Sequence, residues 1–63
     1  YNMSFKDYLN SYRIDRAEEL IINSNEKIYK IAELVGYNNT DYFINKFVQL
    51  KGKTPLQYRK NLK

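Results

Sequence analysis

Apolar residues between Ile28 and Leu50 recur at helical spacing in two separate runs. The first run holds Ile28, Ile31, Ala32 and Val35 at i, i+3, i+4 and i+7, and the second holds Phe43, Phe47 and Leu50 in the same way. This spacing lines one face of a helix. Gly36 separates the two runs, and glycine readily adopts the left-handed conformation that ends helices. Because two short helices joined this tightly cannot form a long hairpin, we predict that they cross steeply as a helix-turn-helix.

A longer helix precedes this pair, and its apolar side changes midway. Ser4 can cap it, Asp7 occupies the third helical position, and no glycine or proline interrupts the chain before Asn23. One cluster contains Phe5, Tyr8, Leu9 and Tyr12, and a second, roughly 160° further round at 100° per residue, contains Ile14, Ala17 and Ile21. An amphipathic helix normally keeps one stripe, so two stripes indicate contacts with two different bodies.

The first of these clusters (Phe5, Tyr8, Leu9 and Tyr12), which we call the aromatic face, has no candidate partner in the chain. We expect the sequence to be a fragment in which a missing N-terminal helical unit covers the aromatic face. Large exposed apolar patches on a monomer usually mark a partner. The alternative is that these side chains wrap the small core.

Capping residues set the limits of the next two helices. Ser24 or Asn25 can cap a helix over residues 26–35. Asn39 can cap a helix over residues 39–50, with Asp41 in its first turn and Gly52 at its end.

A capping box of Thr54, Pro55 and Gln57 opens a last helix over residues 55–61. We expect two of its apolar residues, Leu56 and Tyr58, to return to the core. Its basic residues should point outward: Arg59, Lys60 and Lys63. The sequence therefore predicts an all-α, homeodomain-like helix-turn-helix fold of about four helices, over 4–23, 26–35, 39–50 and 55–61.

Composition narrows the classes of function. A chain of 63 residues forms at most one domain. It lacks cysteine, which excludes disulfides and thiolate metal sites, and histidine, the usual acid–base residue. We therefore expect no metal, no cofactor and no catalytic residue. No apolar run reaches the length of a membrane span and no signal-peptide pattern is present, so we expect a cytoplasmic protein without membrane contact.

The positive charge is concentrated at the C-terminal end. Residues 1–41 hold five basic and seven acidic side chains (5 − 7 = −2), whereas residues 42–63 hold six basic and no acidic ones (+6), which gives the net charge of +4. A basic C-terminal third suits a polyanion such as DNA. Judged by charge alone, a basic tail that is simply surrounded by solvent is an equally good explanation.

The polar side of the helix over 39–50 could read DNA bases in the major groove. With the phenylalanines pointing inward, this side carries Asp41, Asn45, Val48 and Gln49, flanked by Thr40 and Ile44. Amide side chains can pair bidentately with adenine, and a threonine can bond either kind of base edge.

Two residues of this helix have competing interpretations. Ile44 could contact thymine methyl groups or pack at the side of the core. Asp41 could accept from cytosine, although stabilising the helix start is the role we favour.

Phosphate contacts require positive charge or backbone N–H groups around this helix. The candidates are Lys46, Lys53, Thr54, Lys27, Lys30, Arg13 and Arg16. Thr54 qualifies through its backbone N–H, at the start of the last helix. For any single lysine, a solvated surface charge is an equally good interpretation.

The combined pattern resembles the C-terminal half of the AraC/XylS-type DNA-binding domain. The matching residues are I-x-x-IA-x-x-VGY from Ile28 to Tyr37, N-x-x-YF from Asn39 to Phe43, Phe47, and G-x-TP-x-x-YR from Gly52 to Arg59, preceded by F-x-x-YL, Arg13-Ile14 and Ala17. Members are bacterial transcription regulators whose domain joins two helix-turn-helix units by one long helix. The resemblance implies that residues 1–23 are this linker helix, that residues 26–63 are the second unit, and that the first unit is missing.

The resemblance also assigns partners and base contacts. It implies that Thr40, Asp41, Ile44 and Asn45 contact bases, and that a sensor or receiver domain belongs to the same protein. A homodimer would form through absent regions. Many members carry Ser-Arg where this chain has Ile44 and Asn45, and losing that arginine removes a guanine reader or phosphate clamp. We therefore expect this unit to have weak specificity of its own.

Sequence-specific binding of double-stranded DNA is accordingly the predicted function. The alternative is a small helical protein-interaction module, because the seven tyrosines would suit a protein interface. Salt dependence separates the two, since only DNA binding weakens steeply as salt is added. An enzyme is the weakest interpretation because the carboxylates are scattered and no glycine-rich phosphate loop occurs.

Overall fold

The computed structural model describes residues 4–61 and folds them into four helices. They are α1 (Phe5–Asn23), α2 (Ile28–Leu34), α3 (Thr40–Lys51) and α4 (Pro55–Lys60). No strand occurs among the described residues, and the predicted all-α class is confirmed. The helix ends differ from the predicted ones by two residues at most.

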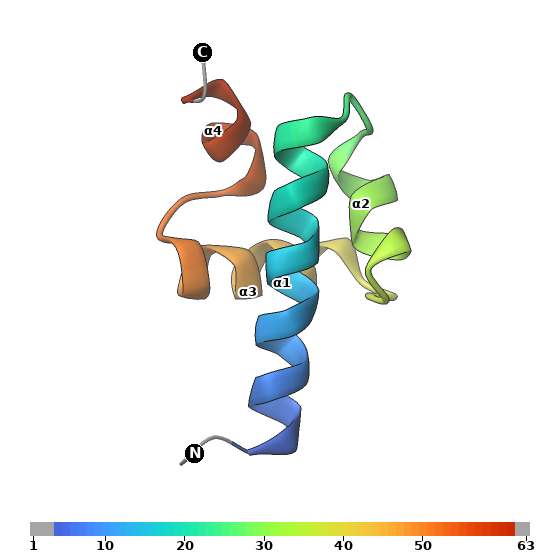
Figure 1. The fold of residues 1–63 in the computed structure, drawn as a ribbon, viewed down its shortest axis with the longest axis vertical. Helices are drawn as coiled ribbons and strands as arrows, with labels where there is room; N and C mark the ends of the chain where they lie inside the picture. Colours follow the sequence, from blue (N-terminus) through green and yellow to red (C-terminus); the bar gives the residue numbers. More distant parts are fainter. Residues whose placement is uncertain (1–3, 62–63) are drawn as a thin grey trace.

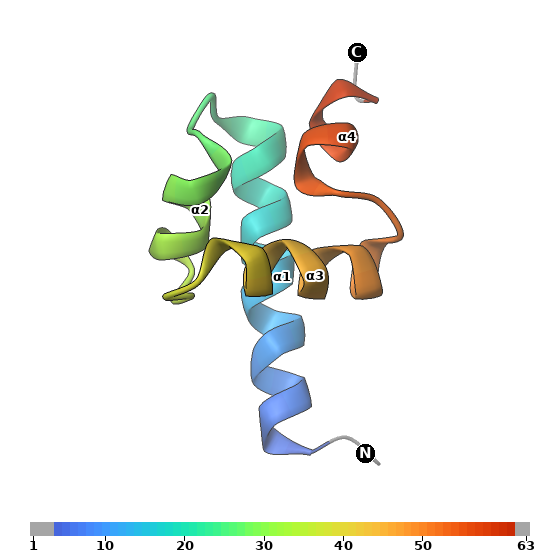
Figure 2. The same cartoon turned by 180° about the vertical axis from the view of Figure 1, so that it is seen from behind.

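Helix α1 is the axis around which the other helices gather (Figure 1). The helices α2 and α4 flank its C-terminal half on opposite sides, and α3 crosses it (Figure 2). The N-terminal half of α1 projects beyond this assembly. The pair α2–α3 therefore has the crossed arrangement predicted for a helix-turn-helix. No helix in residues 4–61 has the length and apolar character needed to cross a membrane.

The core forms where α1, α2 and α3 meet. Its buried apolar members are Ile14, Ala17, Ile21, Ile31, Ala32, Tyr37, Phe43 and Phe47. Aromatic rings connect its parts, because the Phe47 ring centroid lies 6.0 Å from that of Phe43 and 5.5 Å from that of Tyr58 on α4. The second apolar cluster of the long helix thus supports the helix-turn-helix, as its spacing predicted.

Local capping signals account for most of the helix ends. The Asn39 side chain accepts from the backbone N–H of Tyr42 at 3.0 Å and begins α3. The predicted capping box at α4 is present with both of its hydrogen bonds. Gly36 and Gly52 follow helices at φ of 104° and 82°, where a side chain would be strained.

The predicted cap of α2 is wrong. This helix begins at Ile28 after Lys27, which makes no side-chain capping bond. The Ser24 hydroxyl instead donates to the Leu20 carbonyl at 2.7 Å and accepts from the Glu26 N–H, so it closes α1 and shapes the connection. A serine can serve either helix end, and sequence spacing did not decide between them.

Two leucines expected in the core lie outside it. Leu50 is 49% exposed and Leu56 is 59% exposed. The buried side of α3 is centred between Phe47 and Ile44, because α3 crosses α1 instead of running along it. In α4, the buried apolar residue is Pro55, while Tyr58 packs at the core edge as expected.

Arg59 does not point outward as predicted. Its guanidinium donates to the backbone carbonyls of Ile21, Ser24 and Glu26 at 3.3, 3.1 and 2.8 Å. It therefore ties α4 to carbonyls at the end of α1 and in the connection to α2, groups that lack helical partners. Lys60 is exposed, and Lys63 lies outside the described residues.

Candidate nucleic-acid interface

The outward side of α3 is polar and open. Asp41, Asn45 and Gln49 are exposed, while Phe43 and Phe47 behind them are completely buried. Val48 lies at the margin with 37% exposure. The helix therefore presents amide and carboxylate groups to solvent from a rigidly anchored backbone, which is what insertion into a major groove requires.

The residues at the edge of this side are partly covered. Thr40 is half-buried at the start of α3. Ile44 packs against the core, so the side-core alternative is the one the structure favours for it. No contact in the structure tests the base-reading role of the four predicted residues, which stays a prediction.

The structure adds Tyr42, which the sequence interpretation did not select. It is 40% exposed, three residues before Asn45 on the outward side of α3. The ammonium group of Lys46 lies 5.7 Å from the Tyr42 ring centroid and 3.4 Å from Oε1 of Gln49. The helical spacing of Tyr42, Asn45 and Gln49 could have revealed this residue. Lys46 is thus held over the outward side, where its charge can meet a phosphate.

The other phosphate candidates differ in availability. Arg16, Lys27, Lys30 and Lys53 are exposed, and Lys30 pairs with Glu33 at 3.7 Å. The backbone N–H of Thr54 donates to Oε1 of Gln57 at 3.2 Å within the capping box. This N–H was a predicted phosphate donor, but the capping box already occupies it.

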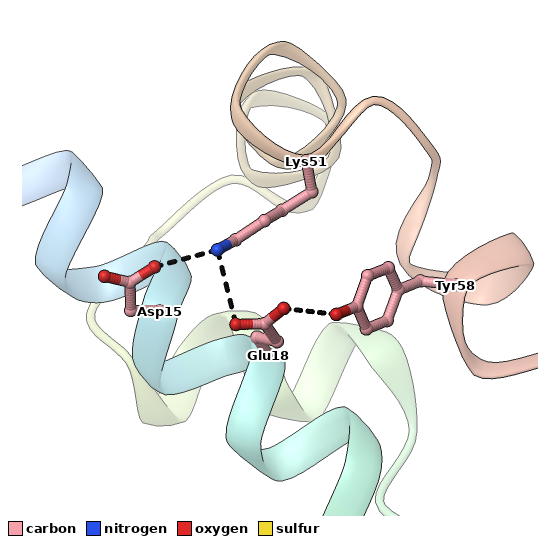
Figure 3. A network of polar contacts seen from close by, with 4 residues as sticks. All are labelled: Asp15, Glu18, Lys51 and Tyr58. Atoms are coloured by element: carbon pink, nitrogen blue, oxygen red, sulfur yellow. Dashed lines mark hydrogen bonds and ion pairs between the residues drawn. The ribbon is translucent and has the colours of Figure 1, made fainter. Parts of the chain in front are cut away.

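An ionic network fixes the far end of α3 to α1 (Figure 3). The Lys51 ammonium lies 2.9 Å from Asp15 Oδ1 and 3.3 Å from Glu18 Oε1. The other oxygen of Glu18 accepts from the Tyr58 hydroxyl of α4. The hydrogen bond with Asp15 raises the pKa of Lys51, and the hydrogen bond with Glu18 raises the pKa of Tyr58. Lys51 therefore serves the fold.

A second contact anchors the turn before α3. The Tyr37 hydroxyl donates to Oδ1 of Asn10 at 2.8 Å, and both residues are buried. The Arg13 guanidinium lies over the Tyr37 ring, 5.5 Å from its centroid. Burial raises the pKa of the Tyr37 hydroxyl, and the charge of Arg13 opposes this rise. Sequence reasoning missed Asn10, because a polar residue on a helix gives no sign that it will be buried.

Comparisons with known proteins agree with the helix-turn-helix arrangement of the described helices. Residues 1–61 match a family model described as "Helix-turn-helix domain". The chain is 41% identical to the C-terminal domain of the two-component response regulator yesN from Fusobacterium nucleatum, with a TM-score of 0.89 over 94% of this chain and 57% of that one. It is 37% identical to the C-terminal domain of AraT, a response regulator from Geobacillus stearothermophilus, with a TM-score of 0.90 over 94% of this chain and 49% of that one.

The chain belongs to the AraC-type helix-turn-helix family. It is also 40% identical over 53 residues to the uncharacterized transcriptional regulator YisR of Bacillus subtilis, a match that covers 84% of this chain and 18% of YisR. The chain spans about a fifth of the length of the first curated relatives that it matches. An AraC-type helix-turn-helix is a DNA-binding module of transcription regulators, so α3 is the recognition helix of this chain.

Proposed function

We propose that this chain is the second half of the DNA-binding domain of a bacterial transcription regulator, and that α3 reads bases in the major groove. The observation that carries the proposal is the division of α3 into a buried phenylalanine side and an exposed side with Asp41, Asn45 and Gln49. Thr40 would contribute at the edge of the groove, beside Ile44, which packs against the core. A protein that binds the bacterial chromosome works in the cytoplasm, so that location is part of the proposal.

We also propose that a first helix-turn-helix unit covers the aromatic face. Three of its four residues are exposed, with Phe5 at 79%, Tyr8 at 61% and Tyr12 at 55%. The chain itself therefore leaves a large apolar surface beside the DNA-reading unit. A receiver domain upstream is supported by the two structural neighbours, each of which is the C-terminal domain of a response regulator. Dimerisation through regions outside this chain remains an expectation.

Two measurements on the complete protein test the DNA-binding proposal. The protein first selects duplexes from a random library, and fluorescence anisotropy then measures its affinity for the selected duplexes. We expect a recurring sequence motif among the selected duplexes and an affinity that falls steeply with salt. Binding that ignores both sequence and salt would instead favour the protein-interaction module. In that case the exposed tyrosines of α1 would form the binding surface.

A further inference from the structure

A cleft of about 310 Å³ opens between the N-terminal half of α1 and the turn that leads into α3. Helix α1 contributes Lys6, Asn10 and Arg13 to its lining, and the turn contributes Tyr37 and Asn39. We call it the Arg13 cleft. It borders the N-terminus of the recognition helix, where the residues that enter a major groove are expected to lie.

The Arg13 side chain is held in place while its hydrogen-bond donors remain unused. Its guanidinium lies over the Tyr37 ring, 5.5 Å from the ring centroid, within reach of a cation–π interaction. A Cβ atom at Gly36 would lie only 3.2 Å from Arg13 Nε, so the side chain lies close against the turn. Within residues 4–61 the guanidinium forms no hydrogen bond or ion pair. A guanidinium already confined between an aromatic ring and the turn loses less freedom when it binds an anion.

Asn10 supplies a second unused donor. The residue is only 7% exposed, and its Oδ1 accepts from Tyr37. Its amide nitrogen has no hydrogen-bond partner among the described residues. Every unpaired polar side-chain atom of these residues is accessible to solvent, so the Asn10 amide nitrogen is accessible too. Because Asn10 lines the cleft, its amide group reaches solvent there. This donor is therefore open to a ligand that enters the cleft.

The lining selects an anion rich in acceptors. Lys6 and Arg13 bring two positive charges, and no carboxylate lines the cleft. Asn39 uses its Oδ1 to cap α3, which leaves its amide donor for a ligand. A phosphate diester offers acceptor oxygens and one negative charge, and it pairs well with a guanidinium.

We propose that the Arg13 cleft binds one phosphate of the DNA strand beside the groove that α3 occupies. This inference rests on the proposed function and deepens it. Arg13 is the fixed clamp, Lys6 adds charge at the rim, and Asn10 donates from the floor. The cleft thereby sets the depth and register of α3 on the duplex, since phosphate contacts position a recognition helix.

Salt dependence provides the first test. A fluorescein-labelled duplex would first be selected from a random library. The affinity of the complete protein for this duplex would then be measured over a range of salt concentrations. Lys6→Gln should lower the slope of log K against log salt by about one, with a several-fold loss of affinity at low salt. Lys60→Gln is the matched control, because Lys60 is an exposed lysine of α4, a helix that contributes no residue to the cleft lining, and it should leave the slope unchanged.

The variant Asn10→Asp and a duplex with one uncharged phosphate position locate the contact between the cleft and the DNA. Asn10→Asp keeps an acceptor for the Tyr37 hydroxyl but puts a negative charge in the cleft, so binding should fall at least tenfold while circular dichroism shows the same helix content. Methylphosphonates, which remove the charge of one phosphate, would be placed singly along the duplex. At one position the substitution should weaken binding by the original protein several-fold, and it should weaken binding by Lys6→Gln less, because that variant has already lost one of the charges that face this phosphate.

Each other outcome overturns the cleft assignment. If Lys6→Gln and Asn10→Asp bind the duplex normally while Asn45→Ala loses discrimination, the cleft binds no phosphate and the proposed function stands. If the cleft variants lower the melting temperature without changing the salt slope, the cleft contacts another part of the protein. If binding is independent of salt and of residue 45, the proposed function fails as well.

Discussion

The two halves of α1 have the same backbone and opposite surroundings. The C-terminal half buries Ile14, Ala17 and Ile21 completely or nearly so against the helix-turn-helix. The N-terminal half leaves Phe5 and Tyr8 largely exposed, although both are larger than the buried residues. Burial in this chain is therefore decided by whether a second element lies alongside. One half of α1 supports the recognition helix, and the other offers a surface for a neighbour.

Removing a core side chain should have the largest effect. Phe47→Ala takes away the ring that connects Phe43 to Tyr58 and should cost about 3–5 kcal/mol of unfolding free energy. Phe5→Ala, from the exposed half of α1, should change it by less than about 0.5 kcal/mol in this chain. Thermal unfolding followed by circular dichroism measures both. Equal losses would show that the exposed half of α1 contributes as much to the free energy of unfolding as the core does.

Adding the proposed upstream unit should change the behaviour of the N-terminal half of α1. With the proposed upstream unit joined to this chain, the melting temperature should rise, because each large apolar side chain that becomes buried contributes about 1.5–3 kcal/mol. In that longer protein, Phe5→Ala should become destabilising by a similar amount. An unchanged melting temperature would argue against a unit that covers the aromatic face.

Two neighbouring positions on α3 should affect DNA binding differently. Asn45→Ala removes a base-edge contact and should reduce discrimination between the selected and a mismatched duplex by about 1–3 kcal/mol. Lys46→Ala should weaken binding to every duplex about equally and lower the salt slope by about one. Competition anisotropy separates the two effects. If Asn45→Ala weakens all duplexes alike, Asn45 does not read bases.

The smallest expected effect is a loss of stability in alkali. The pKa values of Tyr37, Lys51 and Tyr58 are all raised in the folded chain. The folded state therefore holds these protons more tightly than the unfolded state does. The stability that the three protonated groups contribute is complete below the unfolded pKa values, 10.0 for tyrosine and 10.5 for lysine. It is lost as pH rises through the folded values. Urea unfolding between pH 8 and 11 should show this decline.

Tyr58→Phe provides the control for this measurement. The phenylalanine ring keeps the contact with Phe47 but cannot donate to Glu18, so the decline in alkali should become shallower. An identical pH profile in Tyr58→Phe would remove Tyr58 from this account and leave Tyr37 and Lys51 as its causes.

The sequence predicted features that depend on neighbours along the chain. The capping box at Thr54, the Asn39 cap and the helix ends at Gly36 and Gly52 were correct, because each is decided within a few residues. The buried positions Phe43 and Phe47 followed from helical spacing. The exposed aromatic face followed from the lack of a partner stripe, and its exposure rules out the alternative that it wraps the core.

Features that depend on how helices cross could not be predicted. Leu50 shares the spacing of Phe43 and Phe47, but the direction in which α3 crosses α1 leaves it exposed. Arg59 looked like a surface charge and instead binds three carbonyls more than thirty residues away in sequence. The hydrogen bond between Asn10 and Tyr37, on which the Arg13 cleft depends, joins residues 27 positions apart.

Local order in the chain was thus enough to specify the helices, most of their ends and the burial of Phe43 and Phe47 on α3. Hydrogen bonding and helical periodicity act over three or four residues, so they can be read from adjacent letters. The rotation of α3, the role of Arg59 and the existence of the cleft were settled when separate helices came together. Their contacts join residues 27 to 38 positions apart, and no local pattern records such separations.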